Sequence, residues 1–370
     1  MLGASKKVRV LIADDSALMR QQITRMLGED PRIDLIGAAR DGEEAVAKAV
    51  ELRPDVAVLD INMPRMDGLT ALQHILAQEI CPVIVFSSLT QKGAVVTFEA
   101  LELGAFDYLA KPEGTISQNL AALREELVGK ILAAAASKRQ FKPRSRVSPI
   151  PGTQKSRPGA LPGATGTRRP SLPAAGFTKV VMIGVSTGGP VTVMDILPFL
   201  PADFPAPVFL IQHMPPRFTS SFAERLNKEV PMRVVEASHR EMVEAGTVYV
   251  GPGGKHMLLE RPLGREGLRI ALSDHPEDTA FKPSVNVSMH SLLKSFPARN
   301  IVAVLLTGIG DDGADAMVAI KQAGGFTIAE AEETAVVYGM PRAAAERGGA
   351  TIVLPSHQIA AAILQAVHSV

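Results

Sequence analysis

Four short apolar runs in the first third of the chain each stop at a polar residue, and stretches with helical spacing lie between them. The runs are Val8–Ala13, Val56–Leu59, Pro82–Phe86 and Phe106–Ala110. Apolar runs of this length are typical of strands that are buried on both faces of a sheet. Their alternation with helical stretches predicts an α/β fold with a parallel sheet for this part of the chain.

The second half of the chain repeats this pattern. Apolar runs cover Lys179–Val185, Val208–Ile211 and Ile301–Leu306, while residues 232–275 contain short strand-like segments and turns. Aromatic residues make up only 4% of the chain, so small aliphatic side chains must fill the interior, which suits parallel α/β layers. We expect a second, Rossmann-like domain with a mostly parallel, doubly wound sheet and a small antiparallel extension.

Residues 138–173 differ in composition from both halves. They contain seven prolines, nine Lys or Arg and no Asp or Glu. This composition predicts a linker between a first domain at residues 1–137 and a second at residues 174–370. A solvated spacer is the simplest reading, and contact with acidic surfaces or anionic lipid headgroups is the alternative. The flanking parts carry net charges of −5 and −3, which argues against a nucleic-acid partner.

The single cysteine, Cys81, excludes an intramolecular disulfide and fits a reducing compartment. The apolar run after the first basic residues stops at Asp14, too early for a signal peptide or a membrane span. The eight histidines show no zinc-ligand spacing. We therefore expect a cytoplasmic protein that does not insert into membranes.

Polar side chains follow each apolar run of the first domain: Asp14 and Asp15, then Asp60, Ser87 and Lys111. The carboxyl ends of parallel strands meet at one edge of a sheet, where ligands bind. Three carboxylates there would repel one another, and Mg²⁺ with oxygen ligands would relieve this. An Asp carboxylate can form an acyl phosphate, with Lys111 and Ser87 contacting phosphoryl oxygens. Any single Asp could instead cap a helix.

These residues resemble the response-regulator receiver family over about residues 6–130. The motifs are Asp14-Asp15, Asp60 within Asp-Ile-Asn-Met-Pro-Arg-Met-Asp-Gly, Ser87 and Lys111-Pro112. The resemblance implies a flavodoxin-like, five-stranded domain that a histidine kinase phosphorylates on Asp60. It also implies that the backbone carbonyl of Asn62 joins the Asp carboxylates as a Mg²⁺ ligand, and that Tyr108 is a rotating aromatic switch.

Three further polar groups stand at strand ends in the second domain: Ser186, His213 and the pair Asp311-Asp312. Glycines around Ser186 permit a tight turn, and the start of a helix behind it would offer N–H groups to an oxyanion. His213 could act as general base, with an Asp orienting its ring. The order Ser, His, Asp differs from that of ordinary α/β-hydrolases, and the turn is not a Gly-x-Ser-x-Gly elbow.

Other readings remain open on these residues alone. The glycines at 184, 188 and 189 could cradle a nucleotide phosphate, although the Gly-x-Gly-x-x-Gly and Gly-Lys-Ser/Thr patterns are missing. His213 could be a structural histidine, and the Asp pair could cap a helix. A receiver controlling a catalytically dead adaptor is a further alternative, which the intact set of Ser186, His213 and Asp312 argues against.

The second domain also resembles a known family, the chemotaxis protein-glutamate methylesterases (CheB). The motifs are Gly-Val-Ser-Thr-Gly-Gly-Pro, Gln-His-Met-Pro, Gly-Pro-Gly-Gly-Lys-His, Lys-Pro-Ser-Val-Asn, Leu-Thr-Gly-Ile-Gly-Asp-Asp-Gly and Gly-Met-Pro. The resemblance implies hydrolysis of glutamate γ-methyl esters on chemoreceptor cytoplasmic helices and deamidation of receptor glutamines, giving adaptation in chemotaxis without a cofactor in the hydrolase domain. Ser186 would be the nucleophile, His213 the base and Asp312 the orienting carboxylate.

The family pattern has small departures here. Asp311 stands where the family often has Asn, and Ile309 stands where it has Met. Lys282 replaces an Arg, so a bidentate contact cannot be assumed there. The oxyanion and substrate loop would be formed by Thr187, Gly188 and Ile309. The family further implies that the unphosphorylated receiver covers the hydrolase site, with simple tethering as the alternative.

Overall fold

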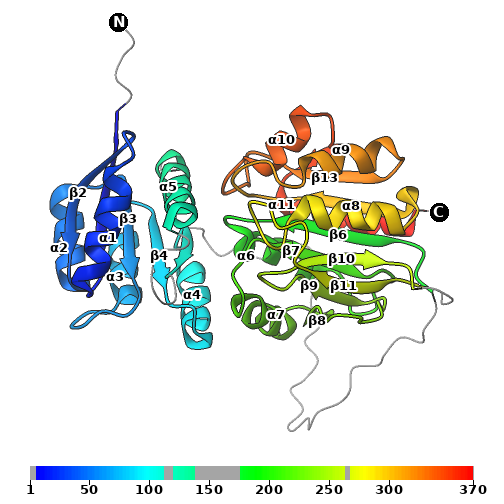
Figure 1. Cartoon of the computed structure of the whole chain (residues 1–370), viewed down its shortest axis with the longest axis horizontal. Coiled ribbons are helices and arrows are strands. Elements are labelled where there is room, and N and C mark those ends of the chain that lie inside the picture. Colours follow the sequence, from blue (N-terminus) through cyan, green and yellow to red (C-terminus); the bar gives the residue numbers. More distant parts are fainter. Residues whose placement is uncertain (1–5, 112–119, 138–175, 263–266, 370) are drawn as a thin grey trace, which may run out of the picture.

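The computed structural model describes residues 6–111, 120–137, 176–262 and 267–369. These residues form two layered α/β domains that lie side by side (Figure 1). The predicted linker at 138–173 lies outside the described residues. Among the helices of the described part, none is long and apolar enough to span a bilayer.

The first domain contains a five-stranded parallel sheet in the order β2-β1-β3-β4-β5. Its strands are β1 (Val8–Ala13), β2 (Ile33–Ala39), β3 (Val56–Asp60), β4 (Val83–Ser87) and β5 (Asp107–Ala110). Its helices are α1 (Ala17–Gly28), α2 (Gly42–Leu52), α3 (Gly68–Ala77), α4 (Gln91–Leu103) and α5 (Leu120–Ser137). This is the doubly wound receiver architecture that the sequence predicts.

Side chains of successive strand residues point to opposite faces of this sheet. Val10 and Ile12 of β1 pack with residues of α1 and α5. Leu11 and Ala13 pack with residues of α2, α3 and α4 on the other face. Both faces are therefore apolar and covered, which explains the continuous apolar runs in the sequence.

The second domain contains a seven-stranded parallel sheet in the order β14-β13-β12-β6-β7-β9-β8. Its strands are β6 (Val180–Val185), β7 (Val208–Gln212), β8 (Arg233–Glu236), β9 (Thr247–Val250), β12 (Ile301–Leu305), β13 (Phe326–Glu330) and β14 (Ile352–Leu354). In the sheet, β7 lies on one side of β6, and β12, which comes later in the chain, lies on the other side of β6. The strand order therefore reverses between β6 and β12, which opens a crevice at their carboxyl ends.

Helices cover both faces of this second sheet. They are α6 (Gly189–Thr192), α7 (Phe218–Glu229), α8 (Val285–Ser295), α9 (Ala314–Gln322), α10 (Met340–Glu346) and α11 (Ser356–His368), with short 3-10 turns η3 (Val193–Asp195), η4 (Leu197–Phe199) and η5 (Ala298–Asn300). Residues of α7 and α11 share one core with one face of β6, and residues of α8, α9 and α10 share a second core with the other.

The segment 232–275 is only partly the antiparallel extension that the sequence predicts. A two-stranded antiparallel hairpin is present, formed by β10 (His256–Glu260) and β11 (Arg269–Ser273). The preceding strands β8 and β9 pair in parallel instead and extend the main sheet beyond β7. The fold class is as predicted, but this half of the segment belongs to the parallel sheet.

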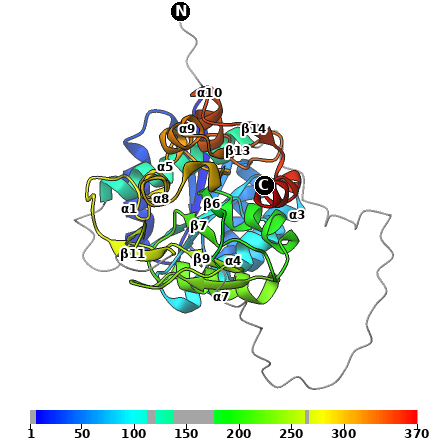
Figure 2. The ribbon, with the colours of Figure 1, turned by 90° about the vertical axis from the view of Figure 1, so that its right-hand side faces the viewer.

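The two domains meet along α4 and α5 of the receiver, as Figures 1 and 2 show. Phe98 of α4 stacks on Phe222 of α7 with ring centroids 5.5 Å apart and meets Phe218 edge-on at 6.4 Å. Arg225 lies 5.7 Å from the Phe98 ring and forms an ion pair with Glu102 of α4. One cluster of buried apolar residues therefore runs from the receiver into the second domain.

Candidate active site

Ser186 lies on a tight turn at the carboxyl end of β6. Its N–H donates to the carbonyl of Thr307 (2.9 Å), and the N–H of Gly189 donates to the Ser186 carbonyl (2.8 Å). Gly188 within the turn has a φ of +79°, and a Cβ there would lie 2.5 Å from Cβ of Val336. Only glycine fits this backbone without strain, so the turn holds Ser186 in a defined place at the sheet edge.

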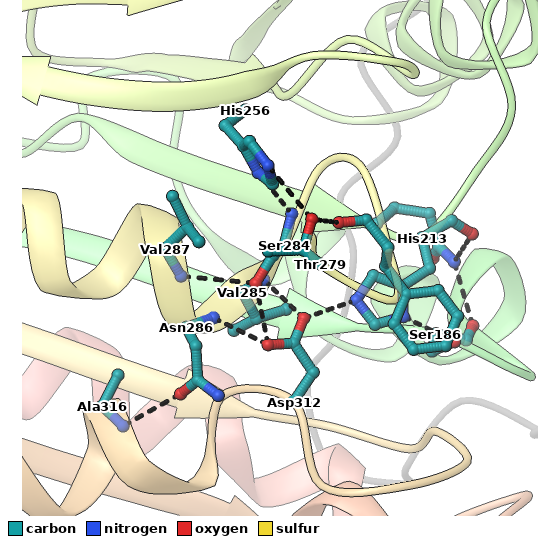
Figure 3. Close-up of polar contacts among 12 residues, drawn as sticks. Ser186, His213, His256, Thr279, Ser284, Val285, Asn286, Val287, Asp312 and Ala316 are labelled. Carbon is teal, nitrogen blue, oxygen red and sulfur yellow. Dashed lines mark hydrogen bonds and ion pairs between the residues drawn. The ribbon is translucent and has the colours of Figure 1, made fainter. Parts of the chain in front are cut away.

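His213, at the end of β7, contacts both Ser186 and Asp312 (Figure 3). Its Nδ1 lies 3.1 Å from Oγ of Ser186, and its Nε2 lies 2.8 Å from Oδ2 of Asp312. An ionised carboxylate only accepts hydrogen bonds, so Nε2 carries the hydrogen and Nδ1 presents its lone pair to the Ser186 hydroxyl. The crevice thus brings together the three side chains that the motifs predict to converge.

Asp312 is held by the beginning of α8. Its Oδ1 accepts hydrogen bonds from Oγ of Ser284 (2.9 Å) and the N–H of Asn286 (3.0 Å), and its Oδ2 accepts the N–H of Val285 (2.7 Å). Burial alone would raise the pKa of this carboxyl, but the hydrogen bonds from His213 and from these amides outweigh it and lower the pKa. Asp312 is therefore a fixed, ionised acceptor for the imidazole.

Asp311 faces in a different direction. Its side chain is 62% exposed and forms an ion pair with Arg347, which also pairs with Asp315. The two adjacent carboxylates thus have separate surroundings, and it is Asp312 that contacts His213.

Gln212 is a contributor that the sequence analysis did not single out. Its Nε2 donates to the carbonyls of Ser186 (3.0 Å) and His213 (3.1 Å), so one buried side chain ties together the segments that carry the two reactive groups. A Cβ on Gly189 would lie 2.1 Å from Oε1 of Gln212. The second glycine of the Gly-Gly pair is therefore required by the packing of Gln212.

Phe281 covers one face of the His213 ring. The ring centroids are 4.0 Å apart and the planes are 11° from parallel. Its own backbone is tied by the hydroxyl of Thr279, which donates to the Phe281 carbonyl (3.0 Å). The imidazole is thus held at its edge by Asp312 and on its face by Phe281, and no feature of the sequence alone signals this stack.

Thr187 and Thr307 join the two loops that border the crevice. Thr187 is buried, and its carbonyl accepts the hydroxyl of Thr307 (2.8 Å). The N–H of Thr307 in turn donates to the buried carboxylate of Glu330 (2.8 Å). The helix expected behind Ser186 is the single turn α6, which is too short to supply a substantial helix dipole.

The loop after Thr307 lies directly against Ser186. A Cβ on Gly308 would be 2.8 Å from Cβ of Ser186, so the backbone approaches closely there. Ile309 turns its side chain toward the receiver, where its Cδ1 would lie 3.9 Å from a Cβ on Gly129 of α5. The Ile309 side chain therefore lies at the contact between the domains.

The carboxyl edge of the receiver sheet gathers Asp14, Asp15, Asp60 and Lys111. The Nζ of Lys111 lies 2.8 Å from Oδ2 of both Asp14 and Asp60. One carboxylate oxygen from each of the three aspartates lies within 4.8 Å of the others. The buried Oδ1 of Asp60 has no hydrogen-bond partner among the described residues. Three carboxylates with one unpartnered oxygen suit a hard divalent cation.

Protonation at this edge follows from the same contacts. Burial raises the pKa of Asp60, and the hydrogen bond and positive charge of Lys111 only partly oppose this. Burial alone would lower the pKa of Lys111, but its contacts with Asp14 and Asp60 outweigh burial and raise it. Lys111 therefore remains a cation beside the two carboxylates.

The remaining receiver residues occupy separate places. Ser87 is buried at the end of β4, and its hydroxyl donates to the carbonyl of Gly93 (3.2 Å). Asn62 is exposed just beyond the end of β3. Tyr108 is buried, and its ring stacks on Phe218 of the second domain with centroids 5.2 Å apart and planes 4° from parallel. The expected switch residue thus contacts the second domain directly.

Comparisons with known proteins agree on both domains. The model of the family described as CheB methylesterase matches residues 181–363, and that of the response regulator receiver domain matches residues 10–123. A "Protein-glutamate methylesterase/protein-glutamine glutaminase" of Caldanaerobacter subterraneus is 50% identical over 98% of this chain and 97% of its own. A second relative with this name, numbered 2, from Carboxydothermus hydrogenoformans, is 51% identical over 98% and 99%. The crystal structure of the Thermotoga maritima CheB methylesterase catalytic domain matches 52% of this chain and 99% of its own, at 38% identity and a TM-score of 0.49.

Proposed function

The chain belongs to the CheB methylesterase family, and we propose that Ser186, His213 and Asp312 hydrolyse glutamate γ-methyl esters and deamidate glutamines on chemoreceptors under control of the receiver domain. The observation that carries this proposal is the unbroken hydrogen-bonded chain from Asp312 through His213 to Ser186.

The tautomer of His213 determines the first step. With Nε2–H donating to Asp312, Nδ1 takes the proton of the Ser186 hydroxyl as Oγ attacks the side-chain carbonyl of the substrate. The negative charge of Asp312 stabilises the imidazolium that forms. Phe281 on the ring face limits rotation of the imidazole during this proton transfer. Amides of the Thr187-Gly188 turn and of Ile309 are the proposed donors to the oxyanion.

Collapse of the tetrahedral species completes acyl transfer. The protonated Nδ1 of His213 gives its proton to the leaving methanol or ammonia, and a glutamyl ester of Ser186 remains. Water then attacks this ester with His213 again as base, which releases the glutamate side chain and restores the Ser186 hydroxyl. A methyl ester and a primary amide have similar shapes, so the same pocket suits both substrates.

The receiver site supports control by phosphorylation on Asp60, with a histidine kinase as the proposed phosphodonor. Asp14, Asp15, Asp60 and the carbonyl of Asn62 would hold Mg²⁺. When bound, Mg²⁺ neutralises charge on the incoming phosphoryl oxygens. Lys111 already lies against the acceptor carboxylate and would contact the phosphoryl group once it is attached. The hydrolase chemistry proposed above uses no cofactor.

The contact between the domains supports inhibition by the unphosphorylated receiver. Helix α5 places Gly129 next to Ile309, on the loop that borders Ser186. Val336 and Val337, on the neighbouring loop, pack against the receiver core. A receptor helix approaching Ser186 would therefore meet the receiver, and phosphorylation would act by weakening this contact.

Further aspects of the proposal concern location and organisation. We place the protein in the cytoplasm, where receptor cytoplasmic helices and a kinase would be accessible to it. We keep the domain boundaries at 1–137 and 174–370, with 138–173 as the connecting linker; α5 ends at Ser137 and β6 begins at Val180.

Methanol release from methylated receptor tests the proposed function. We expect release by the wild-type protein, stimulation by a phosphodonor, and none by Ser186→Ala, whose fold is checked by circular dichroism. An active Ser186→Ala protein would refute the assignment of the nucleophile. A thermal shift with ATP or NAD would favour the nucleotide-binding alternative. Deleting residues 1–137 should raise basal release, and unchanged release would favour simple tethering.

A further inference from the structure

A second histidine, His256, is fully buried at the beginning of β10, close to the triad but outside it (Figure 3). Its Nδ1 lies 3.2 Å from the backbone nitrogen of Ser284. Its Nε2 lies 3.0 Å from the carbonyl oxygen of Pro276 and 3.2 Å from Oγ1 of Thr279. The imidazole therefore bridges the hairpin strand β10 and the segment that leads into α8.

These partners determine the tautomer of His256. The Ser284 amide can only donate, so Nδ1 must be the acceptor. The Pro276 carbonyl can only accept, so Nε2 must carry the hydrogen. Thr279 donates its own hydroxyl hydrogen to Phe281, which leaves its oxygen as a second acceptor for Nε2–H. His256 is thus fixed as a neutral ring with both nitrogens in use. Burial lowers its pKa, and the hydrogen bond to Pro276 only partly opposes this.

The Nδ1 contact leads to Asp312 through one residue. Ser284 is the N-cap of α8, with its backbone amide held by His256 and its hydroxyl donating to Oδ1 of Asp312 (2.9 Å). The next amide, that of Val285, donates to Oδ2, the oxygen that accepts from His213. Rotation of the Ser284 peptide would therefore displace the two groups that donate hydrogen bonds to the Asp312 carboxylate, the Ser284 hydroxyl and the Val285 amide.

The Nε2 contact leads to the face of His213. It ties Pro276 and Thr279, and the Thr279 hydroxyl holds the carbonyl of Phe281, whose ring stacks on His213. Asp312 contacts the edge of the His213 ring and Phe281 covers its face. His256 is connected to Asp312 through Ser284 and to Phe281 through Thr279.

We propose that His256 is a positioning residue for hydrolysis, which keeps Asp312 and Phe281 in register with His213. Its hydrogen bonds go to Ser284, Pro276 and Thr279 and not to Ser186 or His213, so it acts through Ser284 and Thr279. The proposal rests on the proposed roles of the triad and adds a residue that those roles do not require. A purely structural histidine would stabilise the fold without any specific effect on the chemical step.

Two substitutions separate the two ends of the ring. In His256→Asn the side-chain oxygen can occupy the place of Nδ1 and accept from Ser284, while the contact with Pro276 is lost. In His256→Gln the amide nitrogen can reach Pro276, while the acceptor for Ser284 is lost. The matched control is His357→Gln, at an exposed histidine at the beginning of α11.

Steady-state methanol release gives the readout. Because misplacement of a catalytic group by about 1 Å can cost about 100-fold, we expect His256→Gln to lower kcat by about 10- to 100-fold with KM nearly unchanged. His256→Asn, which keeps the support of Asp312 and loses only the support of Phe281, should lower kcat clearly less than His256→Gln does, and His357→Gln should equal the wild type. Wild-type kcat in a folded His256→Gln protein, or equal losses in the Asn and Gln variants, would overturn the proposal.

A double-mutant cycle with Asp312→Asn tests whether His256 affects catalysis through Asp312. If His256 acts through Asp312, then adding His256→Gln to Asp312→Asn should lower kcat little further. A full additional loss would show that His256 acts on stability or on another group, and would refute the route. Ser186→Ala in the same assay keeps the two questions apart, because its activity tests the nucleophile and does not depend on His256.

Discussion

Replacement of Phe98 by Ala tests whether the contact between the domains holds the enzyme inactive. The substitution removes a ring that stacks on Phe222, meets Phe218 edge-on and lies next to the guanidinium of Arg225. Each aromatic pair contributes about 0.5–1.5 kcal/mol and the cation–π contact about 0.5–1 kcal/mol. Since neighbouring contacts are not additive, we take about 2 kcal/mol as the loss to the docked arrangement.

A loss of about 2 kcal/mol changes the ratio of docked to undocked enzyme by about 30-fold. We therefore expect methanol release by unphosphorylated Phe98→Ala protein to rise by up to about 30-fold, limited by the rate of the fully phosphorylated wild type. Stimulation by acetyl phosphate should shrink in proportion, because the variant is already partly open.

The control for this experiment lies on the same helix. Val95 is 60% exposed on α4, so Val95→Ala changes the helix without removing the interdomain contact and should leave basal release unchanged. Phosphorylation of the Phe98→Ala protein shows whether its receiver is folded. If it is folded and basal methanol release stays at the wild-type level, the docking argument is refuted.

Four further predictions concern single residues. Asp60→Asn should abolish the acid-labile phosphoryl group formed with acetyl phosphate, and any remaining label would contradict the assignment. Asp312→Asn should lower kcat by about 10⁴-fold, whereas Asp311→Asn, at an exposed position, should leave it nearly unchanged. Because the pKa of Asp312 is lowered, its contribution to stability is present above its ordinary pKa and is lost as the pH falls through the lowered value, so acid unfolding of Asp312→Asn should be less pH-dependent. Gly189→Ala puts a methyl group 2.1 Å from Oε1 of Gln212 and should lower kcat by about 10- to 100-fold, with wild-type kcat counting against the packing argument.

The strands β1, β3, β4, β6, β7 and β12 could be predicted because strands buried on both faces must be apolar at nearly every position. The edge strand β5 could also be predicted, because three of its four residues are buried. The inner strand β13 could not be predicted in this way, because Thr327 and Glu330 interrupt its apolar pattern. The edge strands β2 and β14 do not meet the condition either. In β2, Asp34 is exposed and Gly37 interrupts the apolar pattern, and β14 has only three residues, with Val353 exposed. The parallel pairing of β8 and β9 depends on where the chain crosses the sheet, which short strands do not encode locally.

The reactive side chains could be proposed from the sequence because each stands at the end of an apolar run. Their supports could not, because each depends on contacts between distant segments. His256 is 28 residues from the Ser284 amide that it accepts, and the Phe281 ring reaches His213 only through the folded path of the chain. Gln212 stands in a recognisable motif, but its hydrogen bond to the Ser186 carbonyl requires the ends of β6 and β7 to be adjacent.

If activation separates the domains, as proposed above, the apolar cluster shared by the receiver and the second domain makes activation depend on temperature. Separating the domains would bring buried carbon surface into water, and hydration of such surface raises the heat capacity of the open form. The free energy that separates the docked from the open enzyme therefore varies nonlinearly with temperature. The apolar contribution to the interdomain contact weakens on cooling. A cell that grows across a wide temperature range would have to offset this drift through the rate of phosphoryl supply.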